Sequence, residues 1–196
     1  GTLVLITDEM RLNAIRLLEF INEKKIERLF FPFIALQHLV EVAYNSKIWP
    51  ESLKDVVTAG EQLQITKHIA TFFTQLSHCR LHNHYGPTET HVVTAYTLEG
   101  PVTSWSPLPP IGKPISNTRI LLLDNEMLPV PHGEPGEIYV DGIALARGYI
   151  NRAELTKERF LQHPFSSDSN SFIYKTGDLG KYLPDGNIEY LGRADS

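Results

Sequence analysis

Residues 80–90 read RLHNHYGPTET, a strand-like run followed by a polar loop. Arg80 to His84 has the length of a short strand, and the Gly86-Pro87 pair that follows fixes a tight turn. The polar side chains of this loop can bond either to water or to a ligand. Ligands in open α/β sheets bind beyond the carboxyl ends of the strands, so the fold around residues 83–90 decides what the loop can do.

The residues before the loop alternate between strand and helix patterns. Short apolar runs predict strands at 3–6, 26–31 and 55–60, and helical spacing of apolar residues predicts helices at 11–23, 34–43 and 66–76. Thr66 is the expected N-cap of the third helix. Repeated strand–helix–strand units predict an α/β fold with a mostly parallel sheet and helices. Gly60 and the loop at 83–90 both follow predicted strands, so both are expected at the ligand-binding edge of that sheet.

The second half of the chain changes to short strands. Prolines and serines at 99–117 predict a surface linker. Strands are predicted at 119–124, 137–141, 146–150, 173–176, 181–183 and 188–191, with one helix at 153–160. Between the last two strands, Pro184-Asp185-Gly186-Asn187 is strong turn chemistry. We therefore expect an α/β part over residues 1–111 and a small antiparallel, β-barrel-like unit over residues 112–191.

Composition limits the classes of function. Hydrophobic residues make up 42% of the 196 residues, enough for a core, and the net charge of -5 argues against nucleic-acid binding, which depends on Lys and Arg. Cys79 is the single cysteine, so no internal disulfide can form and a cytoplasmic setting is favoured. The sequence has no apolar run near the length of a membrane span, so no membrane association is expected. The chain starts without Met and stops after Gly192–Ser196 without a terminating element, which predicts an internal fragment.

Two local patterns could carry chemistry. Hydroxyls and amides around Thr88 can hold phosphate oxygens, and the Glu89 carboxylate can bind Mg²⁺, which usually bridges to substrate phosphates. Tyr85 could stack on a nucleobase whose edge Asn83 reads. Asp178, after a strand and a glycine, can accept two hydrogen bonds from a vicinal diol such as a ribose. The residue types alone favour a plain turn at both places, so ligand binding stays an open alternative at this level.

Other patterns favour structural roles. Residues 142–149 carry two glycines around an apolar run, which indicates close backbone packing with Arg147 paired to an acid. Nothing near Cys79 indicates an activating base, so it is not expected to be a nucleophile. No transition-metal site is expected either, because neither a Cys nor a carboxylate stands at a zinc-like spacing from the three nearby histidines, His82, His84 and His91.

Taken in order, four motifs resemble those of one family. They are Tyr85–Thr90, Gly136–Ile138 with Leu145–Tyr149, Tyr174–Leu179 and Gly192–Asp195. With them the chain resembles nonribosomal peptide synthetase adenylation domains, which belong to the adenylate-forming superfamily with acyl-CoA synthetases and firefly luciferase. The resemblance covers essentially the whole chain, including residues 151–156 and 185–190. It implies an internal fragment of the large N-terminal subdomain, in which residues 192–196 lead to the hinge of an absent C-terminal subdomain.

The resemblance implies a ligase that uses ATP and Mg²⁺. In such enzymes the carboxylate of an amino acid attacks the α-phosphate of ATP, which gives an aminoacyl-adenylate and pyrophosphate. The acyl group then passes to the phosphopantetheine thiol of a carrier domain. The implied partners are therefore the amino-acid substrate and the carrier-protein and condensation domains of a parent synthetase. Reaction at phosphorus requires mainly positioning and charge neutralisation, which a loop that holds both phosphate and metal supplies.

The resemblance also implies roles for individual residues. Thr88 would contact phosphate and Glu89 would hold Mg²⁺, so these two are the candidate catalytic residues. The other candidate nucleotide-binding residues are Tyr85 on adenine, Asn83 near the adenine amino group, Gly60 at the neighbouring strand end, Asp178 on the ribose hydroxyls, Tyr190 beside the nucleoside and Arg193 near the ribose. Asp195 would be the hinge residue.

The amino-acid pocket of this family lies around the strand ends. The matching positions are Ile34 (or Phe33), Val57, Ala59, His84, Val92 and Val93. Val57 and Ala59 lie two residues apart, as lining from one face of a strand requires. The set is mostly apolar, which implies a medium or large apolar or aromatic substrate. His84 would either touch a polar atom of the substrate or bond to backbone.

Three elements of the family are not in this sequence: its Gly/Ser/Thr-rich phosphate loop, the aspartate that pairs with the substrate amino group, and the lysine of the C-terminal subdomain. The chain alone is therefore expected to form adenylate poorly. The alternatives are an acyl- or aryl-acid-CoA ligase of the same superfamily and a noncatalytic nucleotide-binding module. The motifs Tyr85–Thr90 and Leu145–Tyr149 favour the peptide-synthetase branch, and the presence of Glu89 and Asp178 argues against loss of catalysis.

Overall fold

The computed structural model describes residues 1–194, whose contacts group them into two compact units. The first unit contains residues 1–82 and 97–109, and the second contains residues 83–96 and everything described from residue 110 onward. Residues 83–96, which precede the expected boundary at 111–112, are thus grouped with the second unit. Within the part of the chain that the structure describes, no helix combines the length and apolar character needed to cross a bilayer.

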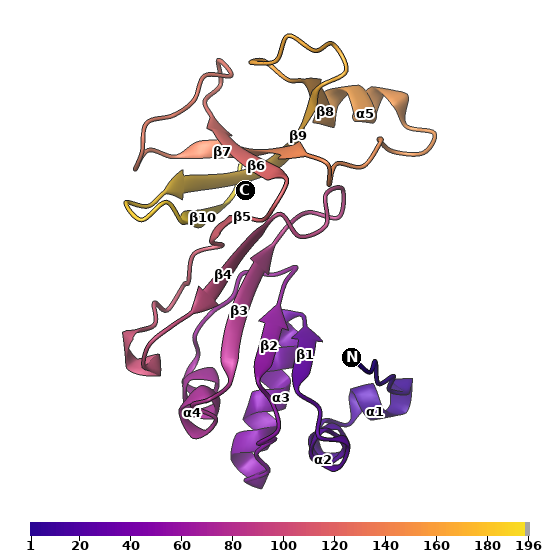
Figure 1. Cartoon of the computed structure of the whole chain (residues 1–196), viewed down its shortest axis with the longest axis vertical. Coiled ribbons are helices and arrows are strands. Elements are labelled where there is room, and N and C mark those ends of the chain that lie inside the picture. Colours follow the sequence, from indigo (N-terminus) through magenta and orange to yellow (C-terminus); the bar gives the residue numbers. More distant parts are fainter. Residues whose placement is uncertain (195–196) are drawn as a thin grey trace. The chain divides into compact units, whose positions relative to one another are not determined.

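The first unit combines parallel strands with helices, as predicted (Figure 1). Its elements are α1 (Asp8–Leu12), α2 (Ala14–Lys24), β1 (Arg28–Phe31), α3 (Phe33–Ser46), β2 (Asp55–Thr58), α4 (Lys67–Gln75) and the short 3-10 helix η1 (Val102–Ser104). Strands β1 and β2 pair in parallel with Leu29 opposite Val56. Helix α3 contacts both α2 and α4, and its residues Leu36 and Val40 are fully buried. Apolar spacing therefore identified most of the buried face of α3 correctly.

Local capping explains where several helices begin. Thr66 is the N-cap of α4, because its hydroxyl accepts the Ile69 N–H at 3.4 Å, as the sequence predicted. Pro32 ends the strand before it and precedes α3, where its missing N–H costs nothing. Asn13 separates α1 from α2, since its side chain accepts the Arg16 N–H at 3.1 Å. The predicted helix over 11–23 is therefore two helices.

Two predictions in this unit are wrong. Residues 3–6 form no strand, and Leu3 and Leu5 are 84% and 80% exposed. An apolar run supports a strand only where another strand pairs with it, and run length carries no information about that partner. Leu12 and Ile15, two of the apolar positions at helical spacing within residues 11–23, are 79% and 47% exposed, and the buried residues of α2 are Ala14, Leu17, Leu18 and Ile21.

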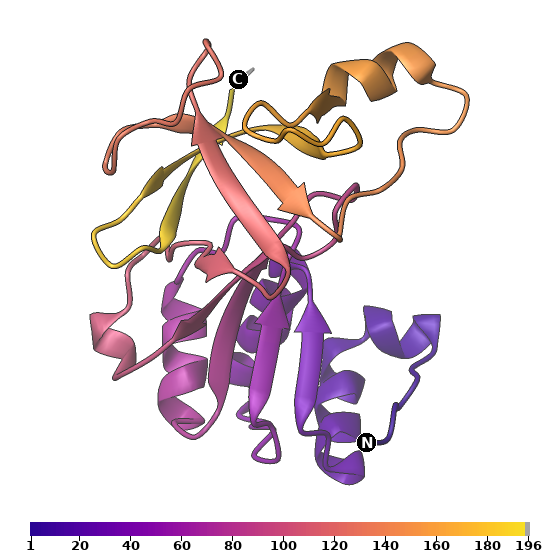
Figure 2. The ribbon, with the colours of Figure 1, turned by 45° about the horizontal axis from the view of Figure 1, so that its top comes forward.

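The second unit is mainly antiparallel (Figure 2). Strands β3 (Arg80–Tyr85) and β4 (Thr94–Leu98) each have residues in both units. The remaining elements are β5 (Lys113–Pro114), β6 (Thr118–Leu123), β7 (Gly136–Gly142), α5 (Ala153–Arg159), β8 (Phe160–Gln162), β9 (Phe172–Tyr182) and β10 (Ile188–Arg193). One sheet has the order β1-β2-β3-β4-β5, and a curled antiparallel sheet has the order β10-β9-β7-β6 with β8 on β9. The core of this unit includes Ile138, Val140 and Ile188.

The turn at residues 184–187 was predicted correctly and joins β9 to β10. Gly186 has φ of +81°, and Asp185 accepts the Asn187 N–H at 3.0 Å. The predicted strand at 173–176 and the first two residues of the one at 181–183 belong to the single strand β9. The linker predicted at 99–117 contains η1 and β5, and the sequence patterns missed β4, β5 and β8.

The strand predicted at 146–150 is wrong, since these residues form an irregular segment. Gly148 has φ of +133°, a conformation outside the strand region that a residue with a side chain rarely adopts. The Tyr149 N–H donates to the Thr156 hydroxyl at 2.9 Å, so it is not available to a ladder. A Cβ at Gly148 would lie 2.5 Å from the Thr156 methyl group, which shows how closely the segment packs on α5.

Candidate nucleotide-binding site

The loop after β3 is closed on itself. The Val93 N–H donates to the Tyr85 carbonyl at 2.8 Å, and the Thr90 N–H donates to the Pro87 carbonyl at 3.1 Å. A Cβ on Gly86 would lie 1.7 Å from the His91 carbonyl oxygen, so only glycine fits there. The loop is thus a fixed structure whose two ends are joined, and it carries its polar residues at set positions.

One end of this loop lies at a buried carboxylate. The Tyr85 hydroxyl donates to Asp178 Oδ2 at 2.6 Å. At the other oxygen, Oδ1, the Tyr190 hydroxyl and Arg193 Nη1 donate at 3.4 Å and 3.3 Å. The rings of Tyr85 and Tyr190 lie 6.1 Å apart and tilted by 43°. Four residues that were predicted to contact the nucleoside therefore converge, although they are separated by up to 108 positions in the sequence.

An irregularity in β9 places Asp178. Pairing of β7 with β9 shifts between Glu137 and Tyr139, which lets residues 176–178 bulge out of the ladder. Glu137 Oε1 accepts the Gly177 N–H at 3.1 Å, and Gly177 has φ of +76°. The Thr176 hydroxyl accepts the Asp178 N–H at 3.0 Å. These bonds hold the bulge in a conformation that presents the Asp178 carboxylate.

The two tyrosine hydroxyls beside Asp178 are neutral donors. Burial, followed by the negative charge of Asp178, raises the pKa of Tyr85 well above its usual range. The same two causes in the same order raise the pKa of Tyr190. A carboxylate with neutral and cationic donors around it can accept further hydrogen bonds, because its two oxygens offer about four lone-pair positions. The three donors already present use three of these positions, so a ribose diol would bond to the remaining one and replace one of the two long contacts at Oδ1.

A second carboxylate lies four residues along the loop. The Tyr149 hydroxyl donates to Glu89 Oε1 at 2.5 Å, and the Tyr174 hydroxyl lies 3.3 Å from that of Tyr149. The Ala146 N–H donates to the Glu89 carbonyl at 2.8 Å. Burial by itself raises the pKa of Glu89, but the hydrogen bond from Tyr149 and lesser contributions outweigh it, so the pKa is lowered. Glu89 is therefore ionised at neutral pH.

The surroundings of Glu89 fit Mg²⁺ better than a metal held entirely by protein. Among the described residues, no group of three or more His, Cys, Asp or Glu could hold a metal ion. Mg²⁺ does not require such a group, because it is usually held by one or two carboxylates together with substrate phosphates and water. The Tyr149 hydroxyl engages only one Glu89 oxygen, Oε1. The carboxylate thus retains acceptor capacity for a cation that arrives with a nucleotide.

The remaining predicted nucleotide residues are placed as follows. Asn83 is buried, and its side-chain nitrogen donates to the Pro110 carbonyl at 2.9 Å, which orients the amide. Thr88 is exposed in the loop. Gly60, with φ of +89°, lies just after β2 in the first unit. Asp195, the predicted hinge residue, lies outside the described residues.

The predicted substrate residues are spread over both units. In the first, Val57 is buried in β2 and Ala59 follows that strand, half-buried. Ile34, at the start of α3 beside Phe33, is 67% exposed, and its N–H donates to Glu61. In the second unit, His84 and Val92 are half-buried. Val93 is fully buried and packs in the core of that unit, so it has the least direct support as a lining residue.

Three residues around the carboxylates carry no functional role in the sequence prediction: Glu137, Tyr149 and Tyr174. Each lies inside a motif of the resemblance, but only the three-dimensional arrangement shows that they contact Asp178's bulge or Glu89. The expected ion pair of Arg147 is not found among the described residues, where this side chain is exposed. His82, one of the three histidines considered for a metal site, lies in the first unit, where it bonds to Asp55 at 3.0 Å and to Thr97.

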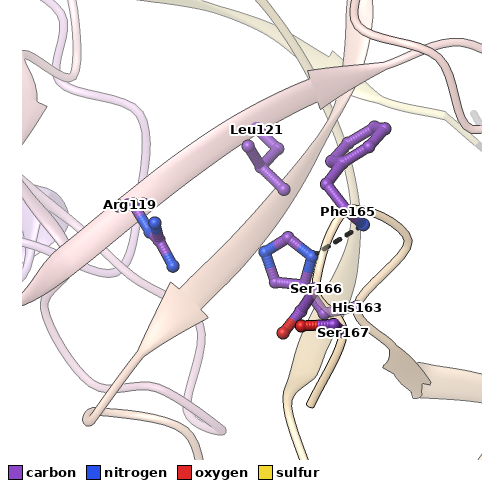
Figure 3. A pocket seen from close by; sticks show the side chains of 6 residues that line it. All are labelled: Arg119, Leu121, His163, Phe165, Ser166 and Ser167. Carbon is purple, nitrogen blue, oxygen red and sulfur yellow. Dashed lines mark hydrogen bonds between the residues drawn. The ribbon is translucent and has the colours of Figure 1, made fainter. Parts of the chain in front are cut away.

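A separate cavity of about 400 Å³ lies in the second unit beside β6 (Figure 3). Its lining residues are Arg119, Leu121, His163, Phe165, Ser166 and Ser167. His163 Nδ1 accepts the Phe165 N–H at 3.1 Å, and Arg119 pairs with Asp141 at 2.6 Å. The cavity contains none of the predicted site residues, and its charged groups already have partners.

Comparison with known proteins supports this picture. The sequence profile of the AMP-binding enzyme family matches residues 1–150. Gramicidin S synthase 2 of Brevibacillus brevis is 44% identical over 195 residues, and tyrocidine synthase 2 of Brevibacillus parabrevis is also 44% identical over 195. In both cases the whole of this chain is covered, but only 4% and 5% of the synthase. The chain therefore spans a small part of these relatives.

Solved structures share the fold. PA1221, described as an NRPS protein containing adenylation and PCP domains, matches with a TM-score of 0.80 and 26% identity, over 92% of this chain and 36% of that one. CmiS6 matches with a TM-score of 0.87 over 96% of this chain and 45% of that one, and its 23% identity supports the fold alone. The chain belongs to the AMP-binding enzyme family.

Proposed function

We propose that this chain forms the nucleotide-binding part of an adenylation domain that activates an amino acid in a nonribosomal peptide synthetase. The observation that carries the proposal is the loop of residues 85–93. Its first residue, Tyr85, bonds to Asp178, and four residues later it presents the ionised Glu89. The loop therefore connects a group suited to a ribose with a group suited to the metal of a nucleotide phosphate. Identity of 44% to peptide synthetases supports this branch over a CoA ligase.

The proposed reaction has two steps. An oxygen of the amino-acid carboxylate attacks the α-phosphorus of ATP, a new O–P bond forms, and the bond to the leaving pyrophosphate breaks. The thiol of a carrier's phosphopantetheine then attacks the acyl carbon and releases AMP. Bound Mg²⁺ would neutralise phosphate charge in the first step. The chain's own residues orient the nucleotide: Asp178 accepts the ribose hydroxyls, Tyr85 packs on the base, and Thr88 donates to phosphate.

The substrate is proposed to be an apolar or aromatic amino acid. Support comes from the residue types at the matching positions in each unit, where Val57 and Ala59 are apolar and only His84 is polar. A carrier-protein and a condensation domain are the proposed partners, and a cytoplasmic location stays a prediction. Measuring exchange of labelled pyrophosphate into ATP with each amino acid, using the full-length domain, tests the substrate class. Fastest exchange with a charged amino acid would contradict it.

A noncatalytic nucleotide-binding module is the competing interpretation. Replacing Glu89 with Ala in the full-length domain separates the two. An adenylating enzyme should lose exchange by about a hundredfold or more, because the variant lacks the carboxylate that holds the metal. A binding module would show no amino-acid-dependent exchange even before the substitution.

A further inference from the structure

Residues 142–149 were expected to have a structural role, but the last of them, Tyr149, bonds to Glu89. The Tyr149 hydroxyl donates to Glu89 Oε1, and the Ala146 N–H donates to the Glu89 carbonyl at 2.8 Å. The same short segment therefore holds the glutamate at both its side chain and its main chain. A carboxylate held in this way has fewer rotamers to lose when it binds a cation.

The backbone and ring of Tyr149 are also held in place. Its N–H donates to the Thr156 hydroxyl at 2.9 Å, and that hydroxyl donates to the Arg152 carbonyl at the start of α5. Its ring packs edge-on against Phe160, with centroids 5.7 Å apart. Phe160 in turn lies 5.0 Å from the ring of Tyr174. The backbone and the ring of Tyr149 are thus both held by neighbouring residues, which fixes the position of its hydroxyl.

Tyr174 completes the arrangement as a second hydroxyl. It lies 3.3 Å from the Tyr149 hydroxyl, on strand β9, four residues before Asp178. Because the Tyr149 hydroxyl gives its hydrogen to Glu89, the Tyr174 hydroxyl is the donor between the two tyrosines. Both tyrosines are donors, and neither competes with Glu89 for a cation as a charged ligand would.

We propose that Tyr149 is a positioning residue that orients the Glu89 carboxylate for the Mg²⁺ of the nucleotide complex, with Thr156 fixing Tyr149. The inference rests on the proposed function, since it takes Glu89 as a metal ligand. The Tyr149 hydroxyl bonds to Oε1 and thereby restricts the orientation of the carboxylate, including that of the second oxygen, Oε2. Loss of such an outer hydrogen-bond partner typically weakens metal binding by about 10- to 100-fold.

The test is the metal dependence of nucleotide affinity, measured by calorimetry on the full-length domain. The probe is α,β-methylene-ATP, which cannot be cleaved to the adenylate. Its dissociation constant is measured once with EDTA and once with Mg²⁺, and the ratio reports the metal's contribution. In Tyr149→Phe this ratio is expected to fall about tenfold, while the affinity in EDTA changes less than about twofold. Tyr182→Phe is the matched control, because it removes one partly buried tyrosine hydroxyl from the same unit, at the Ile120 carbonyl.

The outcomes separate the two claims. If Glu89→Gln leaves the ratio unchanged, the assignment of Glu89 as a metal ligand is wrong and the proposed function loses its main support. If Glu89→Gln lowers the ratio and Tyr149→Phe does not, only the positioning role is overturned. A variant that fails to fold is replaced by Thr156→Val, which removes the acceptor of the Tyr149 N–H and should lower the ratio by about threefold. If Glu89→Gln lowers the ratio but Thr156→Val leaves it unchanged, the positioning role of Tyr149 is also overturned.

Discussion

Asp55 is the electrostatic centre of the first unit, and its replacement by Asn should destabilise that unit measurably. The carboxylate is 5% exposed and accepts hydrogen bonds from Arg28 at 2.9 Å, Arg80 at 2.9 Å and His82 at 3.0 Å. Burial by itself raises the pKa of Asp55, but these hydrogen bonds outweigh it and lower the pKa from 3.8 to about 2. At about 1.4 kcal/mol per pKa unit, the charge contributes roughly 2 kcal/mol.

The sign of the pH dependence follows from this lowered pKa. A carboxylate whose folded pKa is below its unfolded value stabilises the fold above pH 3.8, and the stabilisation is lost as pH falls toward 2. We therefore expect the difference in unfolding free energy between the wild-type chain and Asp55→Asn to be about 2 kcal/mol at pH 7. The difference should stay constant down to about pH 5 and narrow below about pH 4.

Urea denaturation followed by tryptophan fluorescence is the assay. The chain has two tryptophans, Trp49 and Trp105, and both lie in the first unit, against Phe72 and Phe73. The matched control is Glu27→Gln, which breaks an ion pair with Lys54 whose side chains are 62% and 61% exposed. Such an exposed pair is worth less than about 1 kcal/mol. If Asp55→Asn costs no more than Glu27→Gln at pH 7, the reasoning about this buried cluster is refuted.

Three further predictions concern single residues. Gly86→Ala should reduce pyrophosphate exchange by the full-length domain by about a hundredfold, because the added Cβ would meet the His91 carbonyl at 1.7 Å; exchange near the wild-type rate would show that the loop can relax. Glu137→Ala should weaken AMP binding several-fold in calorimetry, because the Gly177 N–H loses its acceptor; unchanged affinity would mean that the bulge holds itself. Burial raises the pKa of Cys79 to about 12, so peptide mapping after iodoacetamide treatment at pH 8 should find it unlabelled in the folded chain; rapid labelling would contradict the burial.

Local patterns predicted most of the helices and strands, because each depends on residues close in sequence. Thr66 and Gly186 act through their own neighbours, and both were predicted correctly. Residues 3–6 show the limit, since whether an apolar run forms a strand depends on a partner that its own sequence does not reveal. The segment 146–150 failed for a related reason: the positive φ of Gly148 follows from packing against α5.

The candidate site likewise has features that local sequence predicts and contacts that only the fold reveals. The sequence identified Tyr85, Asp178 and Glu89 as polar residues in loops or after strands, but their residue types alone favoured plain turns. Only the fold brings Tyr85 to Asp178 and Tyr149 to Glu89, across 93 and 60 positions. The bulge at Gly177 cannot be seen in a strand pattern either, because it depends on the register between β7 and β9. The support for a ligand site therefore comes from the contacts between motifs in the folded chain, which no single motif predicts.

The central claim is that Asp178 and its neighbours form a nucleotide site. The most direct test is calorimetric titration of AMP into the full-length domain carrying Asp178→Ala. The matched control is Asp185→Ala, in the exposed turn of the same β9–β10 hairpin. We predict that AMP affinity falls at least about tenfold in Asp178→Ala, which removes the acceptor for two ribose hydroxyls, and stays within twofold in Asp185→Ala. Equal AMP affinity in the wild type and in a folded Asp178→Ala domain would contradict the account.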